Sequence, residues 1–273
     1  MATVLVVSSQ TVRGAVGAGV AGFALQRLGH RVWQIPTVLF SNHPGLGPVA
    51  GEAVSGEKIA RLWRGILENG WASDVDAVLT GYVARSDAVH AIARIVDDCR
   101  AARSDVQYIC DPAVGDEPKG LYVDAETAGA LRDTLLPRAD CTTPNRFELS
   151  YLTGAPYAET VDAAVEQARM LSPQEVIATS IPTRGGAALG NVRVSQDTHD
   201  AISTTRRPRV PHGTGDLFAG LYLGEGLRAR DAGTADDKAG AFAPAVARLE
   251  RIIAASEAVD ELALTEPSCW EAT

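Results

Sequence analysis

The sequence lacks the features by which a chain crosses or leaves a membrane. None of its 273 residues lie in an apolar run that approaches the roughly 18 unbroken residues of a membrane-spanning helix. Residues 1–7 lead directly into an apolar, strand-like run, with no basic segment and no small-residue cleavage site. We therefore expect neither a signal peptide nor a membrane anchor.

Basic charge and cysteine are also scarce. Against 34 acidic residues there are 25 Lys and Arg, of which only three are lysine, so the net charge is −9. A chain this acidic is a poor ligand for nucleic acid or an anionic membrane, and we expect neither as a partner. The four cysteines form no CxxC pair and no metal-ligand spacing. With no secretion signal, a reducing, cytoplasmic location is expected.

What the sequence does contain is a regular alternation of strand-like and helix-like segments. A hydrophobic content of 46% and a charged content of 22% are typical of a folded protein, and the length fits one domain spanning 1–273. The expected strands are 4–8, 31–40 (broken at Pro36), 77–80, 106–110, 140–143 and 175–179, followed by antiparallel edge strands at 187–194 and 201–205. The expected helices are 16–28, 57–69, 86–100 (with Ser86 as its N-cap), 124–134, 146–152, 161–171, 216–228 and 239–255, and the tail from about 266 is expected to be frayed.

Repeated strand–helix units predict an α/β fold, a three-layer α/β/α sandwich around a mostly parallel sheet. Ligands of such sheets bind beyond the carboxyl ends of the strands. We therefore look for function in the loops that follow Val7, Phe40, Thr80, Cys110, Thr143 and Thr179.

One glycine pattern is misleading. Gly17, Gly19 and Gly22 match the GxGxxG dinucleotide fingerprint, but about nine residues separate them from the preceding strand. The next strand, 32–35, also ends without the carboxylate that would hold a ribose. These glycines are better explained as sites of close helix packing.

The segment His212-Gly213-Thr214-Gly215-Asp216 precedes an expected helix. Small residues at a helix start leave the first backbone N–H groups unpaired, and the helix dipole adds positive potential, so the turn can bind a phosphate. Asp216 could equally be an ordinary first-turn carboxylate that stabilises the helix. The motif alone leaves both interpretations open.

Other segments, taken with this turn, make the sequence similar to the ribokinase-like superfamily of ATP-dependent kinases, and within it to bacterial pyridoxal kinases. The similarity covers about residues 4–250. It is carried by Ser9-Gln10, by Leu28-Gly29-His30-Arg31-Val32-Trp33, by Thr37-Val38-Leu39-Phe40-Ser41-Asn42-His43-Pro44-Gly45, by Thr80-Gly81-Tyr82, by Cys110-Asp111-Pro112-Ala113-Val114-Gly115-Asp116, by Thr143-Pro144-Asn145-Arg146-Phe147-Glu148 and by the turn at Asp216.

The resemblance implies a ribokinase-like fold, a homodimer, and ATP-dependent phosphorylation of the 5′-hydroxymethyl group of pyridoxal in vitamin B6 salvage. Pyridoxal and ATP would be the small-molecule partners, with Mg²⁺ and a possible monovalent cation as cofactors. Asp216 would be the catalytic base, and Gly213, Thr214 and Gly215 the anion hole. The substrate-binding residues would be Ser9, His43, Pro44, Gly45 and Tyr82; the ATP-binding residues would be Asp111, Thr143, Glu148, Thr179, Arg206 and Arg207; and the metal residues would be Asp111, Asp116 and Glu148.

Two positions depart from the family pattern. Relatives usually read Gly-His-x-Gly-Asn after the first strand, where this chain has Gly14-Ala15-Val16-Gly17-Ala18. The missing His and Asn leave two alternatives open: a kinase of another small substrate, such as hydroxymethylpyrimidine or a sugar, and a non-catalytic vitamer-binding protein. No partner is assigned to His212, for which a helix or surface role is expected.

Overall fold

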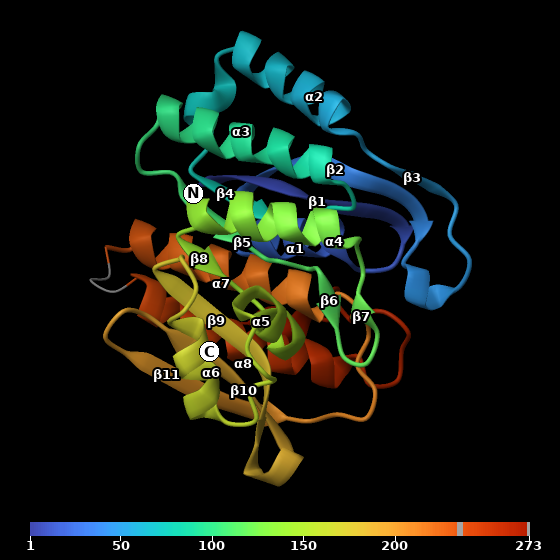
Figure 1. Ribbon diagram of the computed structural model, residues 1–273, viewed down its shortest axis with the longest axis vertical. Coiled ribbons are helices and arrows are strands. Elements are labelled where there is room, and N and C mark those ends of the chain that lie inside the picture. The colour runs from blue at the N-terminus through green and yellow to red at the C-terminus, as the bar shows by residue number, and fades with distance from the viewer. Residues whose placement is uncertain (234–236, 272–273) are drawn as a thin grey trace.

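A single twisted sheet runs through the computed structural model, which describes residues 1–233 and 237–271 (Figure 1). Within these residues the sheet has nine strands, in the spatial order β11-β10-β9-β8-β5-β4-β1-β2-β3. The strands are β1 (Thr3–Arg13), β2 (Arg31–Asn42), β3 (Gly51–Ala53), β4 (Ala77–Thr80), β5 (Gln107–Cys110), β8 (Cys141–Thr142), β9 (Glu175–Thr183), β10 (Ala188–Val194) and β11 (His199–Thr205), and a separate small hairpin joins β6 (Gly115–Asp116) to β7 (Gly120–Leu121).

The six central strands are parallel, and the edge strands β3, β10 and β11 are antiparallel to their neighbours. The central strand β1 pairs with both β2 and β4, and its residues Val4 to Val7 are buried on both faces. An unbroken β-branched run is typical of a strand covered on both sides. The predicted mostly parallel sheet with antiparallel strands at one edge is confirmed.

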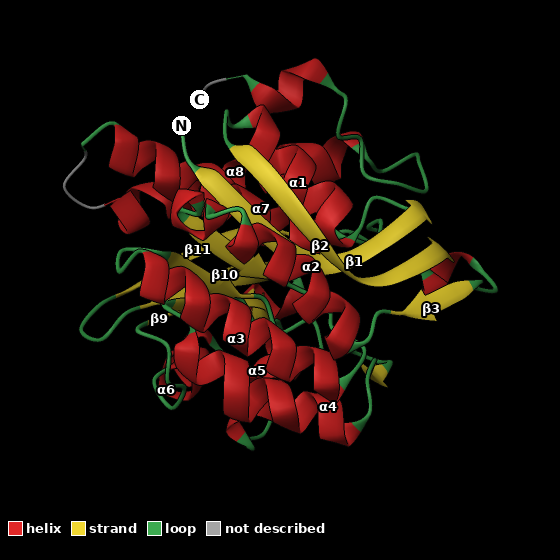
Figure 2. Ribbon diagram, turned by 90° about the horizontal axis from the view of Figure 1, so that it is seen from above, coloured by secondary structure: helices red, strands yellow, loops and turns green. Residues whose placement is uncertain are grey.

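Helices cover both faces of the sheet, as Figure 2 shows, so the predicted three-layer α/β/α sandwich is also confirmed. On one face α1, α7 and α8 pack over Val4, Val6 and Leu79; on the other, α2 and α3 pack over Leu5, Val7 and Val78. The helices are α1 (Gly17–Arg27), α2 (Gly56–Glu68), α3 (Ser86–Ala102), α4 (Ala125–Ala130), α5 (Arg146–Thr153), α6 (Val161–Ala168), α7 (Thr214–Asp231) and α8 (Asp237–Ala255).

The first two strands extend further than the sequence predicts. Pro36 does not break β2; it lies opposite Ser8, beside a β-bulge between Ser8 and Gln10 in β1. A bulge tolerates the proline and changes the direction of the strand. Beyond the bulge, β1 and β2 continue past the end of β4 and project with β3 from the body of the molecule (Figure 2).

Three smaller expectations differ in detail from the structure. Ser86 is the first residue of α3, not its N-cap, and its hydroxyl donates to Glu126 instead. The helix expected at 124–134 is α-helical only to Ala130 and continues as a π-helical turn. The tail expected to be frayed forms a 3₁₀ turn, Pro267–Trp270, with Cys269 buried and the indole N–H of Trp270 donating to the Leu264 carbonyl. Residues 272–273 lie outside the described residues.

None of the helices in residues 1–233 and 237–271 combines the length and the hydrophobicity of a membrane-spanning segment.

Candidate active site

The predicted site residues gather where the central parallel strands end. Ser9 lies in the β1 bulge, Asp111 directly follows β5, and Thr143 directly follows β8. The N-terminus of α7 reaches the same edge of the sheet, since a β-carbon placed on Gly81, just after β4, would lie 3.4 Å from Oδ1 of Asp216. This is the edge of the sheet at which the sequence predicts the ligand site.

The start of α7 is an open anion-binding turn. Gly213 is its N-cap, with a left-handed φ of 95°, and no side chain of the described residues caps the first turn. A β-carbon on Gly213 would lie only 2.0 Å from the backbone oxygen of Ala15, so the turn is packed directly against the loop before α1. The backbone N–H groups of Thr214 and Gly215 are thus available to a phosphate, as the motif predicts.

Asp216 lies in the first turn of α7, and its side chain is half-buried. Burial raises the pKa of its carboxyl group to about 6, although the Gly17 backbone amide beside it lowers the pKa. A carboxylate with a pKa just below neutral is ionised at pH 7 yet accepts a proton readily, as a general base requires.

Asp111 and Glu148 form a buried acidic pair next to this turn. Each is at most 5% exposed. Burial and the charges of Glu148 and Asp216 raise the pKa of Asp111 well above its usual value, and burial also raises the pKa of Glu148. Two buried carboxyl groups with raised pKa values favour a cation or a shared proton between them.

Glu148 also has a structural role. Its Oε2 accepts the Asn145 amide at 2.9 Å, and the Asn145 side chain accepts the Glu148 amide at 3.0 Å, which is a capping box at the start of α5. Its Oε1 accepts the Val114 amide at 2.9 Å. Glu148 therefore fixes the loop that carries Asp116, as well as adding charge to the site.

The carboxylates at this edge of the sheet are candidate ligands for Mg²⁺. In residues 1–233 and 237–271, no three His, Cys, Asp or Glu side chains converge as a metal-chelating group. Among the same residues, Oδ1 of Asp116 is buried without a hydrogen-bond partner. Mg²⁺ commonly takes one or two carboxylates and completes its shell with phosphate oxygens and water. The site fits a metal that arrives with a nucleotide, and does not fit a metal caged by protein alone.

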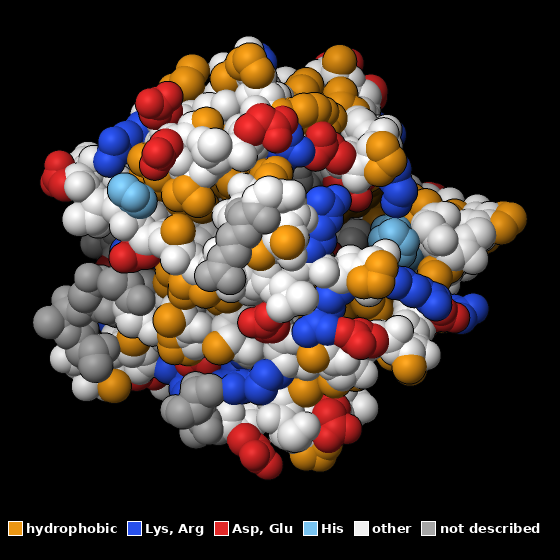
Figure 3. All heavy atoms as spheres, turned by 90° about the horizontal axis from the view of Figure 1, so that it is seen from below, with side chains coloured by type: hydrophobic (Ala, Val, Ile, Leu, Met, Phe, Trp, Pro, Cys, Tyr) orange, Lys and Arg blue, Asp and Glu red, His pale blue; other side chains and the backbone are white. Residues whose placement is uncertain are grey.

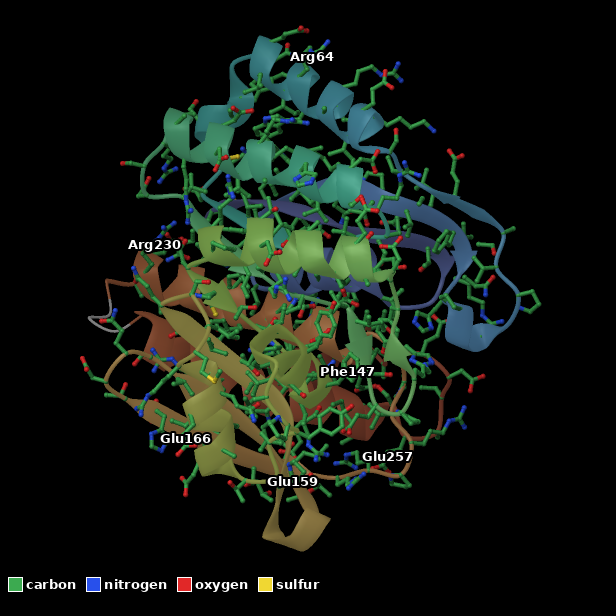
Figure 4. The ribbon with its side chains drawn as sticks, viewed as in Figure 1. Arg64, Phe147, Glu159, Glu166, Arg230 and Glu257 are labelled. Carbon is green, nitrogen blue, oxygen red and sulfur yellow. The ribbon has the colours of Figure 1, made fainter. Side chains whose placement is uncertain are left out.

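The predicted nucleotide residues are only partly brought together. Thr143 directly follows β8, is buried and donates to Asp111 at 2.8 Å. Thr179 lies inside β9, which extends four residues beyond its predicted end, and its amide donates to the Pro144 carbonyl. Arg206 is exposed, and its guanidinium reaches the Gly186 carbonyl at 3.5 Å. Arg207 instead forms an ion pair with Glu257, which is labelled in Figure 4.

The predicted substrate residues His43 and Tyr82 lie in the loops that follow β2 and β4. His43 is the N-cap of the 3₁₀ turn Pro44–Leu46, and its Nδ1 accepts the Gly45 amide at 3.1 Å. Tyr82 is half-buried, and burial raises the pKa of its hydroxyl group. Phe147, labelled in Figure 4, is the second residue of α5 and lies against Gly115 of the β6–β7 hairpin.

Sequence reasoning missed three groups at this site. The His212 ring stacks on His43, with ring centroids 4.1 Å apart. Ser8 Oγ is buried without a hydrogen-bond partner among the described residues, and lies 2.5 Å from the β-carbon position of Gly81. The Gly17 amide lies beside Asp216. In the sequence, only the position of His212 next to the glycine motif indicated its role. The positions of Ser8 Oγ and of the Gly17 amide depend on the β1 bulge and on loop packing. Seen from below, a histidine side chain at the right of the molecule lies beside Lys and Arg side chains (Figure 3).

Known proteins share sequence and fold with this chain. The family profile of phosphomethylpyrimidine kinases matches residues 57–253. The pyridoxal kinase PdxY of Corynebacterium diphtheriae is 34% identical over 236 residues, covering 85% of this chain and 83% of that protein. The PdxY protein of Leifsonia xyli subsp. xyli is 35% identical with the same coverage.

Solved structures share the fold. The pyridoxal kinase from Leishmania donovani in complex with ADP and pyridoxamine superposes with a TM-score of 0.88 at 29% identity, covering 97% of this chain and 94% of that one. The same protein with ADP alone gives a TM-score of 0.87. The ribokinase-like fold implied by the sequence motifs is thereby confirmed, and the chain belongs to the pyridoxal kinase family.

Proposed function

We propose that this protein transfers the γ-phosphoryl group of ATP to the 5′-hydroxymethyl group of pyridoxal, forming pyridoxal 5′-phosphate and ADP. The observation that carries the proposal is the position of Asp216, a half-buried carboxylate in the first turn of a helix whose N-terminus is uncapped and open to phosphate. Related structures hold ADP together with pyridoxamine or pyridoxine, which supports both substrates.

The chemistry follows from the groups at the turn. The hydroxyl oxygen of the substrate attacks the γ-phosphorus while its proton passes to Asp216, and the bond from that phosphorus to the ADP oxygen breaks. The Thr214 and Gly215 amides face the equatorial oxygens, where charge gathers in the transition state. Aligning the two substrates over one base removes much of the entropic barrier.

Mg²⁺ would be held at Asp111 and Asp116 together with the nucleotide phosphates, and it would supply charge neutralisation between the β- and γ-phosphates. Glu148 acts mainly by fixing the loop that ends at Asp116. We infer that Asp111 and Asp116 are the Mg²⁺ ligands from the unpartnered Oδ1 of Asp116 and from the raised pKa of Asp111.

Asp116→Asn should raise the Mg²⁺ concentration needed for half-maximal activity by about three- to tenfold, because the substitution removes one anionic oxygen from a site of few ligands. Activity should return at saturating Mg²⁺. Asp74→Asn, at an exposed position, is the control and should behave as wild type. A Mg²⁺ titration of initial rates measures this, and an unchanged half-maximal concentration in Asp116→Asn would remove Asp116 from the metal site.

The departures at Ala15 and Ala18 do not favour a non-catalytic protein. What the loop before α1 contributes to the anion hole is backbone: the Ala15 carbonyl packs against Gly213, and the Gly17 amide lies beside Asp216. Neither contact needs the side chains that are missing. Phosphoryl transfer is therefore expected to survive both alanines.

Substrate competition tests the proposed function. Pyridoxal should give the larger kcat/KM when it and hydroxymethylpyrimidine are offered to the enzyme with Mg²⁺ and ATP, each product being measured by mass spectrometry. A larger kcat/KM for hydroxymethylpyrimidine would reassign the substrate. Tight pyridoxal binding with no ATP consumption would support the vitamer-binding alternative. The homodimer, the cytoplasmic location and the monovalent cation stay predictions.

A further inference from the structure

Two histidines from separate loops meet beside the anion hole. His43 begins the substrate loop, residues 43–47, and His212 immediately precedes Gly213. Their ring centroids are 4.1 Å apart and their planes are inclined by 33°. At this distance, two aromatic rings attract each other through dispersion and their π systems.

The absence of a side chain at Gly45 leaves space for the His212 ring. A β-carbon at Gly45 would lie 2.3 Å from Nε2 of His212, and the nearest atoms it would meet all belong to the His212 ring. The φ of Gly45 is not left-handed, so backbone conformation does not demand glycine there. The contact with His212 is therefore the reason that this position cannot carry a side chain while the stack is kept.

Each of the two loops also contacts the segment before α1. On one side the His43 amide donates to the Arg13 carbonyl at 3.2 Å. On the other, Gly213 packs against the Ala15 carbonyl. We propose that His212 is a positioning residue that, through its stack on His43, holds the substrate loop at a fixed place relative to the anion hole and Asp216. This inference rests on the proposed function, because it assigns the substrate loop to pyridoxal.

The charges around the two rings suit this role. Burial lowers the pKa of His43 to about 4 and also lowers the pKa of His212, and the Lys119 ammonium acts in the same direction while Asp116 opposes it. Both rings are therefore neutral at pH 7 and stack without mutual repulsion. The partly exposed His212 ring contacts His43 and lies against the backbone at Gly45, and these contacts orient it.

Kinetics of His212 variants test the proposal. His212→Ala should raise the KM for pyridoxal by about three- to tenfold, the range expected for loss of one aromatic pair, with kcat and the KM for ATP within about twofold of wild type. His212→Phe keeps a ring and should restore the KM. His90→Ala, an exposed position on α3, is the control. An unchanged KM in His212→Ala, or a His212→Phe enzyme as impaired as His212→Ala, would overturn the stacking role.

A double substitution isolates the contact itself. Gly45→Ala should displace the His212 ring and raise the KM for pyridoxal as His212→Ala does. In the His212→Ala background, Gly45→Ala should add less than about twofold, because the ring it collides with is already gone. An undiminished effect of Gly45→Ala in that background would show that Gly45 acts independently of His212.

The stack can also be observed without turnover. The His43 ring protons should be shifted upfield in the NMR spectrum of the wild-type protein, should lose that shift in His212→Ala and should regain it in His212→Phe. If wild type forms no pyridoxal 5′-phosphate but these shifts behave as expected, the proposed function fails while the contact stands. If wild type turns over pyridoxal but the His43 chemical shifts are the same in wild type and in His212→Ala, the positioning role is wrong and the proposed function stands.

Discussion

Asp216→Asn should lower kcat by a factor on the order of 10³, the usual contribution of a positioned general base. Asparagine keeps the size and position of the side chain beside Gly17 and Gly81, but cannot take the proton of the attacking hydroxyl group. ADP binding, followed by calorimetry, should change by no more than about twofold, because the phosphate contacts come from backbone amides. More than a tenth of wild-type kcat remaining in Asp216→Asn would rule out this residue as the base.

The same carboxylate links activity and stability to pH. Because the pKa of Asp216 is raised to about 6, wild-type kcat should rise with pH up to about 6 and level off above it. Stability changes with pH in the opposite direction, because the folded state binds this proton more tightly than the unfolded chain does. The contribution of Asp216 to stability is therefore present below its ordinary pKa and is lost as pH rises through about 6. At pH 7, Asp216→Asn should melt at a higher temperature than wild type.

Gly213→Ala should damage both stability and activity. The added methyl group would lie 2.0 Å from the Ala15 carbonyl oxygen, a backbone atom that cannot rotate away, and φ at this residue is 95°. A left-handed alanine alone costs about 1–2 kcal/mol, and the collision must also displace the anion hole or the loop before α1. We expect a melting temperature lower by several degrees and kcat lower by about 10²-fold, since oxyanion-type donors contribute on that scale.

The control for this substitution is Gly129→Ala. Gly129 lies inside α4, and its β-carbon position has no neighbour within 4 Å. Alanine there should leave activity unchanged and raise stability slightly, because it favours helix over glycine by up to about 1 kcal/mol. Thermal melts and initial rates of the two variants compare the sites directly. A Gly213→Ala enzyme with wild-type melting temperature and kcat would show that the turn is not held as described.

The order of strands and helices was predictable because burial patterns are strong in this chain. The apolar run of Val4 to Val7 and the buried stripe of α2 specify their elements locally. The extension of β1 was not predictable in the same way, since it depends on the bulge opposite Pro36 and on pairing with β2. Propensity favours a break at Pro36, and the tertiary pairing overrides it.

The positions of the site residues were predictable to the level of the strand ends, because carboxyl ends of parallel strands meet at one edge. The residues that they contact could not be predicted. The Arg207–Glu257 ion pair and the His43–His212 stack join residues far apart in the sequence, and no local pattern encodes them. The capping box of Glu148 was visible in Asn145-x-x-Glu148, but its bond to Val114 depends on how the β5 loop folds back.

The central claim is that a substrate hydroxyl group is phosphorylated at Asp216. The most direct measurement is phosphorus NMR of the reaction of wild type and Asp216→Asn with pyridoxal, Mg²⁺ and ATP. The account predicts a new phosphomonoester resonance, coupled to the 5′-methylene protons and equal in amount to the ADP formed, with wild type only. ADP accompanied by inorganic phosphate instead, or an equal phosphomonoester signal from Asp216→Asn, would contradict it.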